Sequence, residues 1–281
     1  MKKLSFYFFL TLFLASCNST KHVADKEHML SQNYFFIDSS KTSGSELQKY
    51  VLQKPNPKFI GLPLGLYLHN IGNHNKPQTP SEWAKKNPGS YKFVKNIFSE
   101  KQSIAYAKSF IKLNNWFLNY NGPQILSDTK VKRTADNLWA YYKTQGYFKS
   151  KVDYKINKDS TKKATVEYHI TKGKPTILDT INIKIESPVL DSLYKNSGLE
   201  SLLKKGFQYK DQTFRNEAKN VVKLYLNNGI YNFSENALGF YVDSTRTDYK
   251  TNVDFLISAN RLIENENSGF YVENPYKLES I

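Results

Sequence analysis

Five histidines are the side chains of this chain best suited to metal binding or acid–base chemistry. Their spacing fits no metal-binding motif, and His69 and His74 flank Gly72 in a predicted loop, where we expect them to be solvated. There is no Gly-x-Ser-x-Gly nucleophile motif, and segment 173–176 lacks the first glycine of a phosphate-binding loop. We therefore predict no enzyme, no cofactor and no metal; a hydrolase assembled from distant residues is the weakest alternative. The five are His22, His28, His69, His74 and His169, the last predicted to be exposed on its strand.

The single cysteine, Cys17, stands at the end of a predicted secretory signal. Two lysines precede an apolar run that ends at Leu14, and two small residues then precede the cysteine, as at a cleavage site. The run is too short to span a bilayer core of about 30 Å. Segment 14–17 resembles a lipobox, which implies removal of residues 1–16, lipid attachment to Cys17 and a linker over 17–24. An ordinary signal peptide followed by a chance cysteine is the alternative.

The amino-acid composition narrows the kinds of protein and of binding site that remain possible. The only cysteine is assigned to lipid, so no internal disulfide and no cysteine-based zinc site is expected. The formal charge is +15, or +13 without Lys2 and Lys3. In an exported protein this charge indicates a solvated surface or attraction to anionic lipid headgroups. No RNA-binding sheet or recognition helix is visible, so we predict no nucleic-acid partner.

An internal repeat with an offset of 83 residues occupies the second half of the chain. Each copy has an aspartate that can cap a helix, an apolar stripe of helical period and a glycine stop, Gly146 or Gly229. An apolar pair follows each glycine and is predicted to begin a strand. The corresponding residues are Asp128, Val131, Ala135, Leu138, Tyr142, Gly146 and Tyr147-Phe148 in one copy, and Asp211, Phe214, Ala218, Val221, Tyr225, Gly229 and Ile230-Tyr231 in the other.

Alternating strands continue each copy. Apolar residues alternate over 152–156 and 164–170, and again up to Tyr241 and over 253–257, which predicts two strands per copy. A strand at 174–181 opens the second copy, and 274–281 matches it. The chain is therefore expected to be a fragment or truncated product of a longer protein.

The first copy is predicted to be interrupted. A strand at 30–37 and a short helix at 45–52 are followed by an apolar stretch broken by Gly and Pro. We expect a mobile loop over 72–90 and a helix over 104–118. Together these predict a βααββ module with an insertion at about 54–126.

The order strand, helix, helix, strand, strand, with Gly146-Tyr147-Phe148 after the second helix, resembles a POTRA domain. Segments 17–21, 53–58 and 62–67 resemble the TamA-like lipoproteins of Bacteroidota, a branch of the BamA and TamA outer-membrane assembly factors. Members of that family carry a C-terminal barrel that these 281 residues do not include. The resemblance implies an α+β fold of tandem βααββ (POTRA) modules. They would occupy 25–172 and 174–260, with a linker and the first strand of a truncated third module at 261–281.

The resemblance also implies a function. The chain would be a non-catalytic periplasmic arm of an outer-membrane protein insertion or translocation factor, lipid-anchored in the outer membrane and facing the periplasm. Its partners would be unfolded outer-membrane protein clients, other envelope assembly or translocation components, and the membrane through its lipid anchor. A free-standing lipoprotein adaptor that binds a protein partner without any barrel is the alternative.

Edge strands are the candidate client-binding sites. In POTRA domains the strand after the second helix lies at the sheet edge, and the resemblance implies that it receives clients by β-augmentation. An edge offers free N–H and C=O groups, so pairing is largely indifferent to client sequence. Lys149, Lys151 and Lys155 are read as charges that suppress aggregation, and the two apolar pairs as residues that pack on their own helices. The candidate residues are Tyr147, Phe148, Val152, Tyr154, Ile230 and Tyr231.

Overall fold

The computed structural model describes residues 19–97, 99–243, 246 and 248–258. The predicted signal peptide, the Cys17 lipid site and the 261–281 segment lie outside these residues. By its internal contacts the chain divides into two compact units, whose described residues lie within 1–35, 41–134 and 154–168 for one and within 36–40, 135–153 and 169–281 for the other. Within the described ranges, no helix has the length and apolar character needed to cross a membrane.

The first sheet has four strands in the order β2-β1-β4-β3. Its strands are β1 (Met29–Ile37), β2 (Ser40–Thr42), β3 (Lys151–Lys158) and β4 (Lys163–Thr171). Every second residue of β4 is at most 1% exposed, so one face of this strand is fully covered. These residues are Ala164, Val166, Tyr168 and Ile170.

Two helical segments complete the first βααββ order. The first is a single 3-10 turn, η1 (Leu47–Tyr50), and the second is α6 (Asp128–Thr144). The apolar stripe predicted for α6 is confirmed, because Val131, Ala135, Leu138 and Tyr142 are all buried.

The insertion between η1 and α6 is helical. Its helices are α2 (Leu64–Ile71), α3 (Pro80–Lys86), α4 (Pro88–Ile97) and α5 (Glu100–Leu118). The predicted loop over 72–90 is therefore wrong for its second part, where α3 and the start of α4 lie. Thr79 accepts the N–H of Glu82 at the start of α3, and Pro80 fits the first helical position, where no N–H is needed. Proline here starts a helix, whereas the prediction took it as a breaker.

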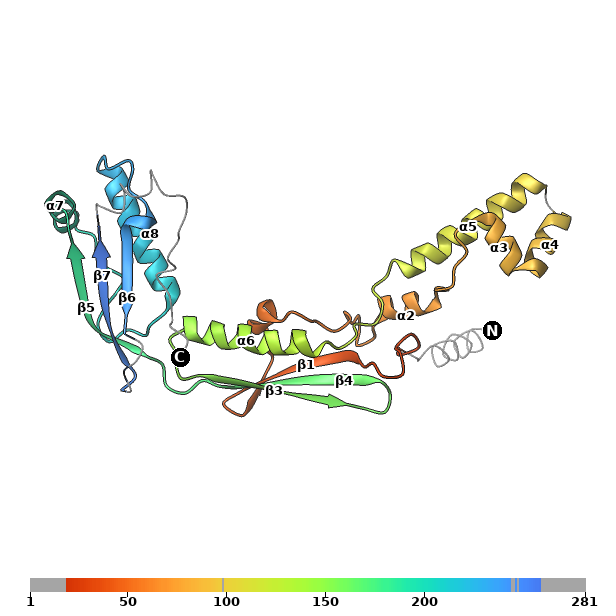
Figure 1. The fold of residues 1–281 in the computed structure, drawn as a ribbon, viewed down its shortest axis with the longest axis horizontal. Helices are drawn as coiled ribbons and strands as arrows, with labels where there is room; N and C mark the ends of the chain where they lie inside the picture. The colour runs from red at the N-terminus through yellow and green to blue at the C-terminus, as the bar shows by residue number, and fades with distance from the viewer. Residues whose placement is uncertain (1–18, 98, 244–245, 247, 259–281) are drawn as a thin grey trace, which may run out of the picture. The chain divides into compact units, whose positions relative to one another are not determined.

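The second sheet has three strands in the order β5-β7-β6. Its module contains β5 (Ile177–Ile185), α7 (Pro188–Asn196), α8 (Asp211–Asn227), η2 (Glu235–Ala237), β6 (Leu238–Val242) and β7 (Lys250–Ile257). Strand β7 pairs parallel with β5 and antiparallel with β6. Leu190 of α7, Phe214 and Tyr225 of α8, and Phe255 of β7 share one buried core, so both helices cover the same face of the sheet (Figure 1). The predicted fold class, α+β with tandem βααββ modules, is confirmed; α7 was not seen in the sequence pattern.

The turns that end α6 and α8 have the same backbone conformation and hydrogen bonds at corresponding positions. Gly146 and Gly229 have φ values of 84° and 88°, the left-handed conformation predicted for them. The N–H of Tyr147 donates to Tyr142 O at 3.0 Å, and the N–H of Ile230 donates to Tyr225 O at 3.0 Å. All of these positions obey the offset of 83, so the repeat is a repeat of backbone geometry.

A second repeated feature is a side-chain hydrogen-bond acceptor inside α6 and α8. Thr134 Oγ1 accepts the N–H of Leu52 at 3.1 Å, just beyond η1, and Glu217 Oε2 accepts the N–H of Leu202 at 2.8 Å, beyond α7. Thr134 and Glu217 are both fully buried and also differ by 83 positions. Each thus ties the segment after the first helix to the second helix of its module.

Candidate functional site

Strand β3 is an edge strand. Among the residues that the structure describes, its hydrogen-bonded strand neighbour is β4 alone, at the end of the order β2-β1-β4-β3. It is eight residues long, while β2 at the opposite edge has three. An edge of this length can pair with a further strand.

The backbone groups on the open side of β3 can be assigned from its hairpin with β4. The Asp159 N–H donates to Lys163 O at 2.9 Å, which closes the hairpin. Because ladder bonds alternate along an antiparallel pair, the odd-numbered residues of β3 bond to β4. The N–H and C=O groups of Val152, Tyr154 and Ile156 therefore point to the open side.

The same three residues carry the apolar face of β3. Val152 and Ile156 are half-buried, and Tyr154 is 41% exposed. Lys151, Asp153 and Lys155 are exposed in between. The open edge thus combines directed backbone groups with accessible apolar side chains on one face.

The predicted strand starts are wrong. Strand β3 begins at Lys151 and β6 at Leu238, so Tyr147-Phe148 and Ile230-Tyr231 lie in turns before the strands. The left-handed glycine reverses the chain, and the N–H groups of Tyr147 and Ile230 are used to close the helices. Phe148 and Ile230 pack against the core of the second module, whereas Tyr231 is 83% exposed.

The edges of the second sheet are less open. Strand β6, at one edge, has five residues, of which Leu238, Gly239 and Phe240 are buried. Strand β5, at the other edge, has an irregularity between Leu178 and Ile181. Such an irregularity disturbs the ladder that a further strand would need at this end of β5, whereas Ile181 to Ile185 pair in regular register with β7.

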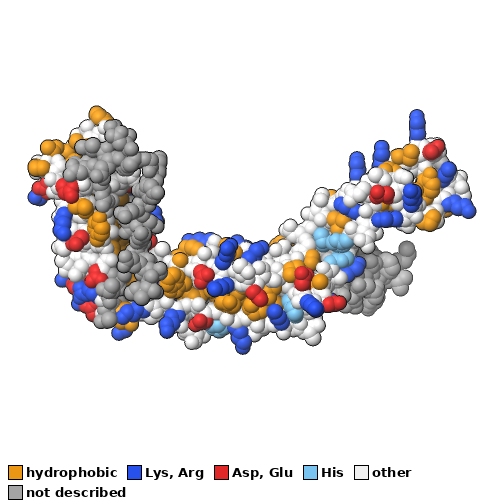
Figure 2. All heavy atoms as spheres, in the orientation of Figure 1, with side chains coloured by type: hydrophobic (Ala, Val, Ile, Leu, Met, Phe, Trp, Pro, Cys, Tyr) orange, Lys and Arg blue, Asp and Glu red, His pale blue; other side chains and the backbone are white. Residues whose placement is uncertain are grey.

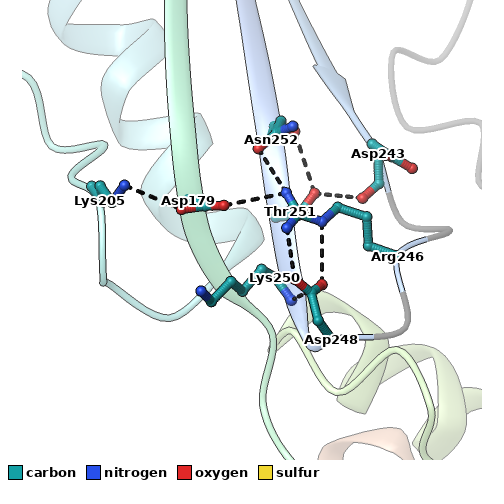
Figure 3. Close-up of polar contacts among 8 residues, drawn as sticks. All are labelled: Asp179, Lys205, Asp243, Arg246, Asp248, Lys250, Thr251 and Asn252. Carbon is teal, nitrogen blue, oxygen red and sulfur yellow. Dashed lines mark hydrogen bonds and ion pairs between the residues drawn. The ribbon is translucent and has the colours of Figure 1, made fainter.

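A polar network holds β5 to the connection between β6 and β7 (Figure 3). Arg246 donates to Asp248 through Nε at 3.2 Å and Nη2 at 2.6 Å, and its Nη1 reaches Asp179 at 3.2 Å and Asn252 at 3.1 Å. Lys205 lies 3.3 Å from the other oxygen of Asp179. The hydrogen bond from Lys205, and then the charges of Lys205 and Lys250 and the Arg246 bond, lower the pKa of Asp179. The network fixes this end of β5 beside β7.

Three of the histidines come together, which their spacing did not indicate. The ring of His74 lies 4.0 Å from that of His22 and 4.9 Å from that of His69, centroid to centroid. Partial desolvation, and then the charges of His22, His69 and Lys21, lower the pKa of His74. Over the described residues, no group of three or more His, Cys, Asp or Glu side chains is placed to hold a metal ion. His169 is exposed, as predicted, and stacks on Phe36 at 4.8 Å.

The fold is a chain of tandem βααββ modules in which the eight-residue strand β3 forms an open edge. No protein-family model and no curated protein matches the chain. Solved structures that resemble it include POTRA domains 1–2 of the periplasmic domain of Omp85 from Anabaena, 8% identical, with a TM-score of 0.31 over 84% of this chain and 98% of that chain. POTRA domains 3–5 of BamA from Haemophilus influenzae are 12% identical, with a TM-score of 0.28 over 84% and 99% of the two chains.

A third similar structure is BamA from Haemophilus ducreyi lacking POTRA domains 1–3, 12% identical, with a TM-score of 0.29 over 52% of this chain. The chain spans 26% of the length of that BamA chain.

Proposed function

We propose that this chain is a lipid-anchored, non-catalytic periplasmic arm that serves outer-membrane protein insertion or translocation. In this proposal it holds extended client segments by β-augmentation at the open edge of β3. The membrane attachment is through lipid on Cys17. The sequence resemblance to POTRA-bearing assembly factors supplies the cellular setting, and the geometry of β3 supplies the mechanism.

The observation that carries the proposal is the alternation along β3. Val152, Tyr154 and Ile156 direct their backbone groups to the open side, and Tyr154 leaves an apolar ring accessible beside them. A client strand that pairs there extends the sheet through main-chain hydrogen bonds. Its alternate apolar side chains can then pack beside the ring of Tyr154.

A proline on the open side tests this mechanism. Tyr154→Pro removes an N–H that faces away from β4, so the β3–β4 ladder is kept, and proline is tolerated on edge strands in that orientation. We expect Tyr154→Pro to lose binding of a peptide of about ten alternating apolar and polar residues, the pattern of a barrel strand. Binding is measured by fluorescence anisotropy with the full chain.

Two controls make the result specific. Tyr154→Ala removes the same ring but keeps the N–H, so it should retain more binding than Tyr154→Pro. Lys155→Pro removes an N–H that bonds to β4 and should instead lower the thermal midpoint. Equal peptide binding by the parent chain and Tyr154→Pro would contradict augmentation at this edge.

A further inference from the structure

The helical insertion contains more than half of the exposed large apolar side chains among the described residues. Of 22 exposed large hydrophobic residues, 12 lie within residues 59–118. Among the described residues of the same segment, the buried hydrophobic ones are Leu66, Trp83, Val94 and Ala107. An exposed apolar surface of this extent marks a contact site.

The exposed residues are ordered along the helices. On α5, Tyr106, Phe110 and Leu113 follow one another at spacings of four and three, and each is about half exposed. On α4, Phe93 and Ile97 are four apart, at 66% and 57% exposure. Trp83 of α3 packs on Tyr106 at 5.6 Å without covering it. The helices therefore present apolar faces that their own packing does not fill.

The charges of the same segment are almost all positive. Residues 59–118 contain eight lysines and two glutamates, 8 − 2 = +6. Glu82 and Glu100 both lie in the first turn of a helix, where a carboxylate stabilises the helix dipole. Within the part of the chain described, none of the eight lysines forms an ion pair. Figure 2 shows lysine and hydrophobic side chains interspersed over α3, α4 and α5.

A strained turn adds to this surface. Phe59 and Leu62 exchange backbone hydrogen bonds at 2.8 and 3.0 Å around Ile60 and Gly61, whose φ values are 49° and 78°. Isoleucine is rarely found in the left-handed region, because its branched side chain crowds the backbone. Phe59 is 65% exposed and Ile60 86% exposed. A strained backbone that presents two apolar side chains to solvent is costly for the fold, and such cost is typical of contact sites.

The insertion is joined to the start of the described chain. Asn70 of α2 donates to Ser19 O at 3.4 Å, and Lys21 Nζ donates to Asn70 O at 3.3 Å. Ser19 follows the predicted lipid site by two residues, a stretch that spans at most about 7 Å. Lipid on Cys17 would therefore keep α2 close to a bilayer surface.

We propose that the helical insertion, residues 59–118, lies on an anionic lipid bilayer. The aromatic and aliphatic side chains enter the boundary between headgroups and acyl chains, and the lysines lie over the anionic headgroups. This contact goes beyond the client-binding edge on β3, and it depends on the residues of the insertion rather than on those of the sheet.

Tryptophan quenching by brominated lipids tests the contact in the full chain. The chain is reconstituted with vesicles of phosphatidylcholine and phosphatidylglycerol that contain brominated acyl chains. Trp116, 49% exposed in α5, should be quenched, so that Trp116→Phe loses the quenched part of the emission. Trp139→Phe is the matched control, because Trp139 is 42% exposed but lies in α6.

Charge reversal of the lysines provides a second test of the membrane contact. Lys85→Glu, Lys92→Glu and Lys95→Glu together should abolish the quenching of Trp116, as should neutral vesicles or 1 M salt. The same charge change on β3, through Lys151→Glu, Lys155→Glu and Lys158→Glu, should leave the quenching of Trp116 unchanged.

Quenching that is equal on neutral vesicles, or that is lost with Trp139→Phe instead, would overturn the proposal. Absence of quenching on all vesicles would also overturn it and would assign the apolar surface to a protein. None of these readouts depends on client binding, so either proposal can fail alone.

Discussion

Thr134 and Glu217 occupy corresponding positions of the repeat, and each accepts a backbone N–H from the segment after the first helix of its module. The two side chains share no chemistry beyond an acceptor oxygen. In the sequence they are a threonine and a glutamate within apolar stripes, which gives no reason to pair them. The structure reveals the shared role because it brings each side-chain oxygen within hydrogen-bond distance of a backbone N–H that is distant in the sequence.

Removal of either acceptor should destabilise its module. Thr134→Val keeps the shape of the side chain but leaves the Leu52 N–H unpaired, so we expect a loss of about 1 kcal/mol in the free energy of unfolding. Glu217→Leu should act in the same way through Leu202. Thr134→Ser and Glu217→Gln retain an acceptor oxygen and should stay closer to the parent chain in urea denaturation. If the valine and serine variants unfold at the same urea concentration, the hydrogen bond is not the stabilising contact.

At the scale of the elements, the turns after α6 and α8 share one geometry in different surroundings. A Cβ on Gly146 would lie 2.5 Å from Tyr209 O, whereas a Cβ on Gly229 would meet nothing within 4 Å. Both glycines have positive φ, so alanine is strained at either position by about 1–2 kcal/mol.

Gly146→Ala should therefore cost more stability than Gly229→Ala. We expect about 1–3 kcal/mol of additional loss, because the backbone at Tyr209 must shift to admit the methyl group. Guanidinium denaturation of the two single variants measures the difference. Equal losses would mean that the chain around Tyr209 relaxes without cost.

Sequence periodicity predicted the elements whose residues alternate or recur strongly. The β3–β4 hairpin and β7 appear where alternation placed them, β1 appears where a segment rich in Tyr and Phe predicted a strand, and Gly146 and Gly229 adopt the predicted conformation. The predictions that were wrong failed for local reasons. The pairs after each glycine are apolar like strand residues, but the helix-closing hydrogen bonds hold them in turns. Helix α3 was missed because its segment is rich in proline and asparagine and was taken for a loop, whereas Thr79 and Pro80 start a helix.

The candidate site was predictable in part. Alternation in the sequence located Val152 and Tyr154 on a strand, and the resemblance implied that this strand lies at an edge. The side of β3 to which each backbone group points depends on its register with β4, which no single-strand pattern contains. The histidine cluster was missed because His22 is remote in sequence from His69 and His74.

For the molecule as a whole, acidification should weaken the two compact units in separate steps. His74 has a lowered pKa in the folded chain, so the unfolded chain binds its proton more readily. The stability of its unit is then complete above the ordinary histidine pKa of about 6.5 and falls as the pH drops below it. Asp179 also has a lowered pKa, so its contribution is present above its ordinary value of 3.8 and is lost as the pH falls through the folded value.

Thermal midpoints recorded from pH 7.5 to pH 3 should show both steps. His74→Gln should flatten the step below about pH 6.5, and Asp179→Asn should flatten the one below about pH 4. Hydrogen exchange at the same pH values assigns each step to residues 64–76 or to β5. An unchanged midpoint curve in His74→Gln would show that the contacts among the three rings do not affect stability.

The alternation along β3 has a consequence for how a bound client segment can move along the strand. If a client strand pairs with the even-numbered residues, a shift of one residue would turn its apolar side chains to the opposite face. A shift of two residues, about 7 Å, restores both the hydrogen bonds and the faces. A bound segment could therefore advance along β3 only in two-residue steps, and the eight residues of the strand leave room for a few of them before the segment must leave.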